Sequence, residues 1–234
     1  MPLSANPSLW EKEDATVTKI YSLNCRSLKK HHQDILSDSI LLKADIILLQ
    51  ETWLEDDDPL EELDIPSYSL NSNSCGRGKG VAIYFKEHLF TPNVKETYRN
   101  IQYSNVISSI LNIATIYRSQ DGSFKMLSQL IEIYTDKNTR HLIVGDLNFC
   151  YHGNEGKPLR TSLEKLNFTQ IIQEPTHIEG NLLDHAYVRT LNSQLKFKSE
   201  LHSKYYTDHK GIAVMIRKVS ICCMYLFTNI HIFI

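Results

Sequence analysis

Polar residues that could carry chemistry flank several apolar, strand-like runs of the sequence. The run HLIV leads into Gly-Asp-Leu-Asn, which sets Asp146 and Asn148 two residues apart. Residues of the same kind flank the other runs: Asn24, Glu51, Tyr117, Asp184, Asp208 and His209. Side chains at strand ends lie on loops held by a rigid scaffold, where catalytic groups are concentrated. If these ends share one edge, the site holds carboxylates, amides, a phenol and an imidazole.

This set of groups suits the metal-assisted hydrolysis of a phosphate ester. A carboxylate such as Glu51 is a hard oxygen ligand of the kind that Mg²⁺ takes from proteins. Asp146 could orient and deprotonate a water molecule. His209 could donate to a developing oxyanion, and Asp184 could hold its imidazole in one tautomer. Amide and phenol donors could grip the phosphate oxygens, so that charge is stabilised during in-line attack.

Each motif taken alone also has an ordinary structural interpretation. An Asp-Leu-Asn sequence after glycine is more often a turn than the position of a base. Glu51 could be a solvated strand end, Tyr117 a core residue and His209 part of a capping turn. His31, His32 and His185 are interpreted as structural. The order and spacing of the whole set, rather than any single motif, favours the functional interpretation.

The elements that must position these side chains alternate between strand-like and helix-like patterns. Strands are predicted within residues 15–24, 45–51, 76–89, 104–119 (a pair), 141–148, 184–190 and 211–219, and helices within 27–44, 123–138 and 160–172. Residues 52–74 are predicted to be loop-like, with a short acidic turn. Because some strands are adjacent in sequence, we expect an α/β (α+β) fold of two packed sheets flanked by helices.

Length and composition favour one domain. The chain has 234 residues, a formal net charge of -2 and 42% hydrophobic residues, which is ordinary for a globular protein. The charge gives no global basic footprint for nucleic acid, although a local patch remains compatible with it. The five cysteines show no CxxC spacing, which makes a zinc site improbable and favours a reducing compartment.

The two ends of the chain differ from its middle. We predict an N-terminal extension at residues 1–15, a domain at 16–219 and an apolar tail at 220–234. The first 15 residues contain no apolar core of signal-peptide length, so an intracellular protein is expected. The tail is shorter than the roughly 20 residues that a membrane span needs, so we expect an extra strand or a loosely tethered segment and no membrane partner.

Several motifs, in this order, resemble the endonuclease/exonuclease/phosphatase family. They are SLNCRSL, ILLQETWL, IYRS, IVGDLN, LLDHAYV and YYTDHKGI, and they extend from about Ile20 to about Val219. The family resemblance implies a four-layer α/β sandwich of two mixed sheets with a divalent metal site at one end. Mg²⁺ is the implied metal, with Mn²⁺ as an alternative.

The resemblance also implies roles for individual residues. Asn24, Glu51 and Asp208 match the residues at the metal. Asp146 matches the base that activates water, and Asp184 matches the acid that orients His209; with Tyr117 these form the implied catalytic set. The implied phosphate-binding residues are Asn148, Tyr117, His209 and Gln120.

Departures from the family pattern indicate which branch of the family the chain resembles. Repair nucleases of the family usually have Asp where Arg26 stands, and Asn where Gln120 stands. NxRSL and ETWL look like the endonuclease domains of mobile elements, of the Helitron type or the non-LTR retrotransposon type. Arg26 puts a second acidic ligand at its position in doubt.

The sequence therefore predicts a Mg²⁺-dependent endonuclease that nicks DNA and derives from a transposable element. A monomeric domain is expected, once part of a larger polyprotein and nuclear if it acts on DNA. A rim of basic residues would fit phosphate binding: Lys29, Lys30, Arg77, Lys79, Arg118 and Lys204. The alternatives are a phosphatase or an RNA-directed nuclease of the same fold, and a decayed transposon fragment that acts only as a binding module.

Overall fold

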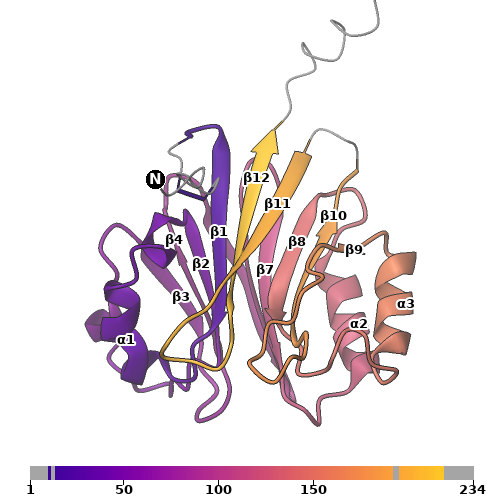
Figure 1. The fold of residues 1–234 in the computed structure, drawn as a ribbon, viewed down its shortest axis with the longest axis horizontal. Coiled ribbons are helices and arrows are strands. Elements are labelled where there is room, and N and C mark those ends of the chain that lie inside the picture. The colour runs from indigo at the N-terminus through magenta and orange to yellow at the C-terminus, as the bar shows by residue number, and fades with distance from the viewer. Residues whose placement is uncertain (1–9, 12–13, 192–194, 219–234) are drawn as a thin grey trace, which may run out of the picture.

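Two mixed six-stranded sheets pack face to face in the computed structural model, which describes residues 10–11, 14–191 and 195–218 (Figure 1). One sheet has, in spatial order, β11 (Leu195–His202), β12 (Gly211–Lys218), β1 (Val17–Asn24), β2 (Ile46–Gln50), β4 (Val81–Phe85) and β3 (Ser69–Asn73). The other has β5 (Thr91–Tyr98), β6 (Ile101–Ile107), β7 (Asn112–Arg118), β8 (His141–Asp146), β10 (Asp184–Arg189) and β9 (Thr169–Gln170). Each sheet has one parallel pair, β1 with β2 and β7 with β8.

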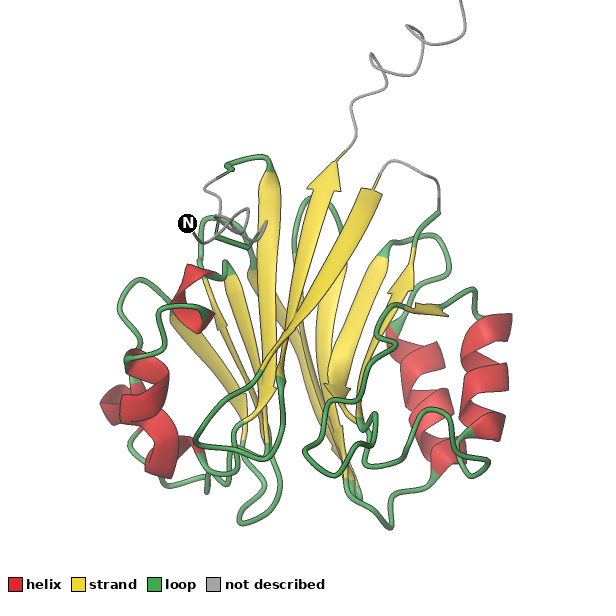
Figure 2. Ribbon diagram, viewed as in Figure 1, coloured by secondary structure: helices red, strands yellow, loops and turns green. Residues whose placement is uncertain are grey.

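Helices cover the outer faces of both sheets, which gives the four layers predicted from the sequence (Figure 2). They are α1 (Leu28–Leu36) on one side and α2 (Phe124–Tyr134) and α3 (Lys157–Lys165) on the other, with short 3-10 helices at Leu41–Lys43 and Leu60–Leu63. Ser27 and Ser123 cap α1 and α2, because each side chain accepts a hydrogen bond from a backbone N–H of the first turn. No helix of the described residues is long and apolar enough to cross a membrane.

The alternation of side chains along each strand sends the polar strand ends inward. In β1, Ile20 joins the core between the sheets, whereas Tyr21 and Leu23 join the core beneath α1. Asn24 has the same parity as Ile20, so it faces the space between the sheets. In β8, Leu142 and Val144 join the inner core, and Asp146 continues that inner face.

Strand register then places inner-face residues beside one another. Tyr117 at the end of β7 pairs with Asp146 on β8, and Asp146 pairs with Asp184 on β10. Gly145, the residue before Asp146, lies on the outer face of β8 and is close to the backbone of β7. A Cβ there would lie 1.9 Å from the carbonyl oxygen of Ile116, so glycine is required at this approach.

Some elements differ from the prediction. Residues 27–44 form α1 and a separate 3-10 helix rather than one helix, and α3 ends at Lys165, before the Thr169–Gln170 strand. The edge strands β3, β5 and β11 were not predicted. Trp10, within the predicted N-terminal extension, is buried, and its indole donates to the carbonyl of Ile40. The apolar tail at 220–234 lies outside the described residues.

The buried His141 at the start of β8 should make stability depend on pH. Burial, with Arg189 nearby, lowers the pKa of His141 from its ordinary 6.5 to about 4, and Thr139 Oγ1 lies 2.5 Å from its Nε2. Below pH 6.5 the unfolded chain therefore binds a proton that the folded chain takes up only near pH 4. Stability should fall as the pH decreases through this window, by about 2 to 3 kcal/mol between pH 7 and 4.5.

Urea unfolding of the protein and of His141→Gln, which keeps an acceptor near Thr139, measures this contribution. Other groups titrate in both proteins, so the difference between the two pH dependences isolates His141. Equal losses of unfolding free energy on acidification would contradict the prediction.

Candidate active site

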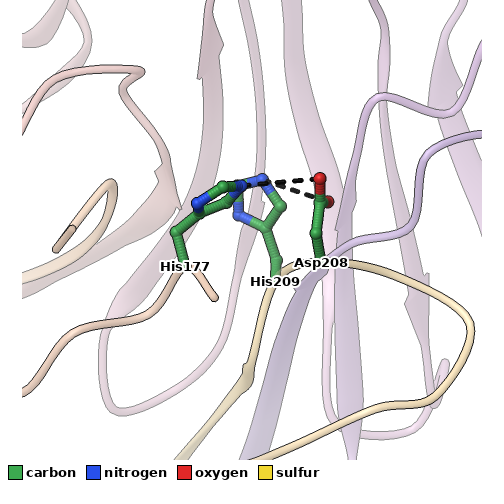
Figure 3. A group of neighbouring side chains, drawn as sticks. All are labelled: His177, Asp208 and His209. Atoms are coloured by element: carbon green, nitrogen blue, oxygen red, sulfur yellow. Dashed lines mark ion pairs between the residues drawn. The ribbon is translucent and has the colours of Figure 1, made fainter. Parts of the chain in front are cut away.

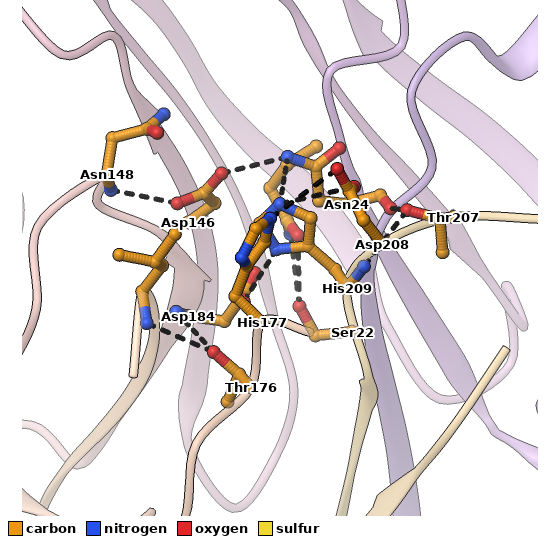
Figure 4. Close-up of polar contacts among 12 residues, drawn as sticks. Ser22, Asn24, Asp146, Asn148, Thr176, His177, Asp184, Thr207, Asp208 and His209 are labelled. Atoms are coloured by element: carbon orange, nitrogen blue, oxygen red, sulfur yellow. Dashed lines mark hydrogen bonds and ion pairs between the residues drawn. The ribbon is translucent and has the colours of Figure 1, made fainter. Parts of the chain in front are cut away.

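Asn24 lies at the centre of a polar group between the sheets (Figure 4). Its amide nitrogen donates to Glu51 Oε1 at 3.0 Å and to Asp146 Oδ2 at 2.8 Å, and lies 3.5 Å from His209 Nε2. An amide NH₂ has two hydrogens, and the two carboxylates take both. Asn24 is fully buried, so it ties the end of β1 to both acids.

Asp146 is a fully buried carboxylate with two fixed donors. The backbone N–H of Asn148 donates to its Oδ1 at 2.8 Å, and Asn24 donates to its Oδ2. Burial and the neighbouring Asp184 raise the pKa of Asp146 well above its ordinary value, against the opposing effects of His209 and the two donors. A carboxyl whose pKa is raised in this way is a better proton acceptor than an ordinary aspartate.

His209 and Asp184 form a buried pair. His209 Nδ1 lies 2.8 Å from Asp184 Oδ2, which leaves Nε2 facing Asn24. Burial lowers the pKa of His209, but Asp184, Asp146 and Asp208 raise it further, to about 9. The imidazole is therefore held as a cation whose Nε2–H can donate into the site. Asp184 is itself fixed, since its backbone N–H donates to Thr176 Oγ1 at 2.9 Å.

Glu51 and Tyr117 approach the group from opposite sheets. Glu51 follows β2 with a φ of 50°, a left-handed conformation that costs energy for a residue other than glycine. Its carboxylate accepts from Asn24 and, at 3.2 Å, from the Trp53 indole. Burial and the carboxylates of Glu51 and Asp146 raise the pKa of Tyr117, so its phenol stays protonated and can act as a donor.

Asn148 is braced by Arg118, which corrects one element of the predicted basic rim. The Arg118 guanidinium is buried; its Nη1 donates to the carbonyls of Leu147 at 2.5 Å and of Asn148 at 3.2 Å. Asn148 Nδ2 in turn donates to the carbonyl of Arg118 at 3.0 Å. Arg118 therefore fixes the loop after Asp146 instead of facing solvent. Lys204 is also covered, paired with Asp38.

Gln120 is the predicted phosphate-binding residue with the fewest ties to this group. Gln120 is exposed. Its backbone carbonyl accepts a hydrogen bond from Arg118 Nη2 at 3.0 Å. Among the described contacts, its side chain has none with the other predicted site residues. The other eight predicted site residues, which lie at or beside strand ends, converge, whereas the side chain of Gln120 lies on the turn after β7.

His177 is a site residue that the sequence analysis missed. Its Nε2 lies 3.5 Å from Asp208 Oδ2, and its ring meets the His209 ring edge-on with centroids 4.9 Å apart (Figure 3). A single β-bridge between His177 and His209 fixes this approach. His177 lies in the turn-like stretch EPTHIEG, and it follows no strand, so neither its type nor its place indicated a site.

Arg26 meets the same acid from the other side. Its Nη1 lies 2.5 Å from Asp208 Oδ2, and its side chain is 49% exposed. The position therefore carries a cation that neutralises Asp208 in this structure, in place of a further acid. The backbone of Arg26 and Ser27 is left-handed, with φ of 45° and 96°, which turns the chain sharply before α1 begins.

The donor atoms fit a divalent cation. Asp208 Oδ1 is buried and accepts no hydrogen bond within the described structure, so it can take a cation or a water molecule as its partner. Two groups of side chains have ligand atoms within 4.8 Å of one another: His177, Asp208 and His209, and Asp146, Asp184 and His209. In the second group His209 would have to bind the cation through Nε2, because Asp184 already engages its Nδ1. Glu51 belongs to neither group, although its oxygens keep lone pairs beyond those that Asn24 and Trp53 occupy.

The fold and this inward-facing group of acids, amides and histidine define a phosphoesterase of the four-layer α/β sandwich class. The chain belongs to the endonuclease/exonuclease/phosphatase family, whose sequence model matches residues 21–209. It is accordingly a hydrolase of the kind that acts on phosphodiester bonds. No curated protein sequence matches the chain significantly.

Solved structures share the fold at low identity. The endonuclease domain of TRAS1, a telomere-specific non-LTR retrotransposon, is 16% identical with a TM-score of 0.64, over 87% of this chain and 100% of that one. An AP endonuclease from Archaeoglobus fulgidus is 16% identical with a TM-score of 0.67, over 84% and 98%. The 3' phosphatase NExo from Neisseria, solved with a product DNA hairpin, is 17% identical with a TM-score of 0.61, over 84% of this chain and 98% of that one.

Proposed function

We propose that the protein is a metal-dependent endonuclease that nicks DNA, derived from a transposable element. The observation that carries this proposal is the convergence of Asn24, Asp146, Asp184 and His209 on one buried point between the sheets. A buried carboxylate that can take up a proton lies there beside a buried imidazolium. A phosphodiester needs these two groups at its attacking water and at its non-bridging oxygens.

Asp146 acts on the attacking water. The water oxygen forms a bond to phosphorus, and one proton of the water passes to the Asp146 carboxylate. The phosphorus–oxygen bond to the leaving strand breaks, and the leaving oxygen keeps the bonding electron pair and takes a proton from solvent. Asn24 and the N–H of Asn148 hold that carboxylate in place throughout. Asp146 therefore needs no rearrangement to serve as the base.

His209 acts on the phosphate. Its Nε2–H donates to a non-bridging oxygen, on which negative charge increases during attack. Asp184 keeps the ring oriented through Nδ1. Tyr117 is proposed as a further donor, and so is the amide of Asn148, which also donates to the carbonyl of Arg118.

The metal is proposed to be Mg²⁺, with Mn²⁺ as the alternative that nitrogen ligands would favour. Glu51, Asp208 and Asn24 would hold it, and His177 is close enough to Asp208 to join them. A divalent cation in this place supplies charge neutralisation at the phosphate. Arg26, which pairs with Asp208 here, would have to share that carboxylate.

Membership of the transposable-element branch rests on the motifs NCRSL and ETWL and is supported by the shared fold of the TRAS1 endonuclease domain. A nuclease of this origin would act as a monomeric domain on nuclear DNA. The same fold is used by the Neisseria 3' phosphatase, so substrate has to be decided by experiment.

Incubation with supercoiled plasmid and Mg²⁺ should convert the plasmid to open circles, because one active site cuts one strand at a time. Agarose electrophoresis measures the conversion, and an excess of EDTA should abolish it. A single-stranded RNA and a nitrophenyl phosphate monoester are incubated in parallel. Faster hydrolysis of the monoester than of the plasmid would identify the protein as a phosphatase instead of a nuclease. Faster loss of the RNA would identify an RNA-directed nuclease.

A further inference from the structure

An open cavity of about 420 Å³ adjoins the candidate site on the side of α1. Its lining includes Arg26, Lys30, Trp53, Tyr205, Tyr206 and Asp208. Asp208 is common to the cavity and the site, since its Oδ1 lies 3.8 Å from His209 Nε2. The cavity is thus continuous with the place proposed for the scissile phosphate, and its volume is within the range of small-molecule sites.

Aromatic rings form much of this cavity, and hydrogen bonds at their polar ends fix them. The Tyr205 hydroxyl donates to Asp34 at 2.6 Å, and the Tyr206 hydroxyl donates to Asp38 at 3.1 Å. The two tyrosine rings meet edge-on, with centroids 5.2 Å apart. The Trp53 indole is held by its hydrogen bond to Glu51.

Tyr205 is the ring whose exposure needs an explanation. It is 83% exposed although it is large and partly apolar, and its hydroxyl already has a partner in Asp34. An exposed, anchored ring at the mouth of a cavity offers a flat face for stacking at little further cost in conformational entropy.

Cations complete the surroundings. Lys30 is exposed on the first turn of α1, and Arg26 is half exposed beside Asp208. Each can contact a phosphate of a strand that enters the cavity. Rings for a base and cations for its phosphate, next to one another, are the two components of sites for unpaired nucleotides.

We infer that this cavity binds one unpaired nucleotide of the DNA, next to the scissile phosphate. The base stacks on the exposed ring of Tyr205, and Lys30 and Arg26 hold its phosphate. A base inside an intact duplex has both faces covered by its stacked neighbours, so only a base outside the stack can use these rings. The inference rests on the proposed function and narrows it, because DNA with an unpaired nucleotide at the cleavage position becomes the preferred substrate.

Binding in EDTA tests the cavity without cleavage. Fluorescence anisotropy would give the Kd for three labelled DNAs: a paired duplex, the same duplex with one bulged nucleotide, and the same bulge lacking its base. The protein should bind the bulged duplex about 10-fold more tightly than the other two, the effect of stacking one base on a protein ring. Equal affinities for all three would overturn the inference.

Three variants identify the residues. Tyr205→Ala should lose the preference for the bulge, whereas Tyr205→Phe, which keeps the ring, should retain it. Tyr98→Ala is the matched control, since Tyr98 is half exposed on β5, away from the cavity lining. A preference that survives in Tyr205→Ala, with thermal unfolding unchanged, would also overturn the inference.

Plasmid nicking by the same preparation separates this inference from the proposed function. Nicking in Mg²⁺ without any preference for the bulge would support the proposed endonuclease activity and refute nucleotide binding in the cavity. A preference for the bulge without cleavage of any DNA would support nucleotide binding in the cavity and refute the proposed endonuclease activity.

Discussion

Replacing Asp146 with asparagine is expected to lower the rate of DNA nicking by about 1,000-fold while DNA binding is retained, because asparagine cannot take the proton of the attacking water. The substitution changes few atoms. Asn148 N–H could still donate to a side-chain oxygen at this position. The second contact cannot persist unchanged, because an amide NH₂ would then face the Asn24 amide, which now donates to Oδ2.

The free energy of unfolding should stay the same or increase in Asp146→Asn. Asp146 and Asp184 are paired in the register of two adjacent strands, and each is nearly inaccessible to solvent. Removing one of two close acids relieves repulsion, and active sites are commonly arranged at such a cost in stability. Retained nicking in a variant with normal stability would exclude Asp146 as the base.

Asp136→Asn provides the control. Asp136 is an exposed acid after α2, and its side chain accepts from the backbone N–H of Asn138. An amide oxygen can accept the same bond. The nicking rate of Asp136→Asn should equal that of the unmodified protein. Its Kd for a paired duplex in EDTA should match that of Asp146→Asn, because both variants replace one carboxyl group with an amide.

The inward-facing residues could be predicted because their positions follow from local pattern. Asn24 and Asp146 end runs that read clearly as strands, and a period of two then determines which face they join. The tight approach of Gly145 to the neighbouring strand likewise has a local signature, a glycine directly before the acid. The layers followed from the number of such runs and from the helices between them.

Elements with exposed faces escaped prediction. β5 has the sequence TPNVKETY and is exposed along most of its length, and β11 alternates lysine with other residues. Neither has the apolar run of a buried strand, because each lies at the edge of its sheet, where only one neighbour pairs with it. Their existence is determined by the neighbouring strands rather than by their own residues.

Contacts between distant loops were also beyond the sequence. His177 reaches the site from a turn, and only its bridge to His209 brings it there. Arg118 looked like a surface cation, yet carbonyls of two later loops and the ring of Phe124, 4.1 Å from its guanidinium, enclose it. An arginine can be buried in this way because several carbonyls satisfy its donors, and that condition is tertiary.

The second large effect is expected at the His209–Asp184 pair. His209→Ala removes the donor to the phosphate and should lower the nicking rate by about 100- to 1,000-fold. Asp184→Asn should lower it by a similar or smaller factor, because the ring then loses the carboxylate that fixes Nδ1. His32→Ala, which removes a buried histidine of α1, is the control for the loss of an imidazole elsewhere.

The double variant distinguishes two ways in which Asp184 could act. If Asp184 acts only by orienting His209, removing it from a protein that already lacks the imidazole should change little, so the double variant should nick about as fast as His209→Ala alone. If the two effects multiply, Asp184 acts on its own. An independent role would point to the group of Asp146, Asp184 and His209 as the metal ligands, in place of Glu51 and Asp208. The 2.8 Å contact between Asp184 and Nδ1 favours the first outcome, since an oxygen committed to that bond is less available to a cation.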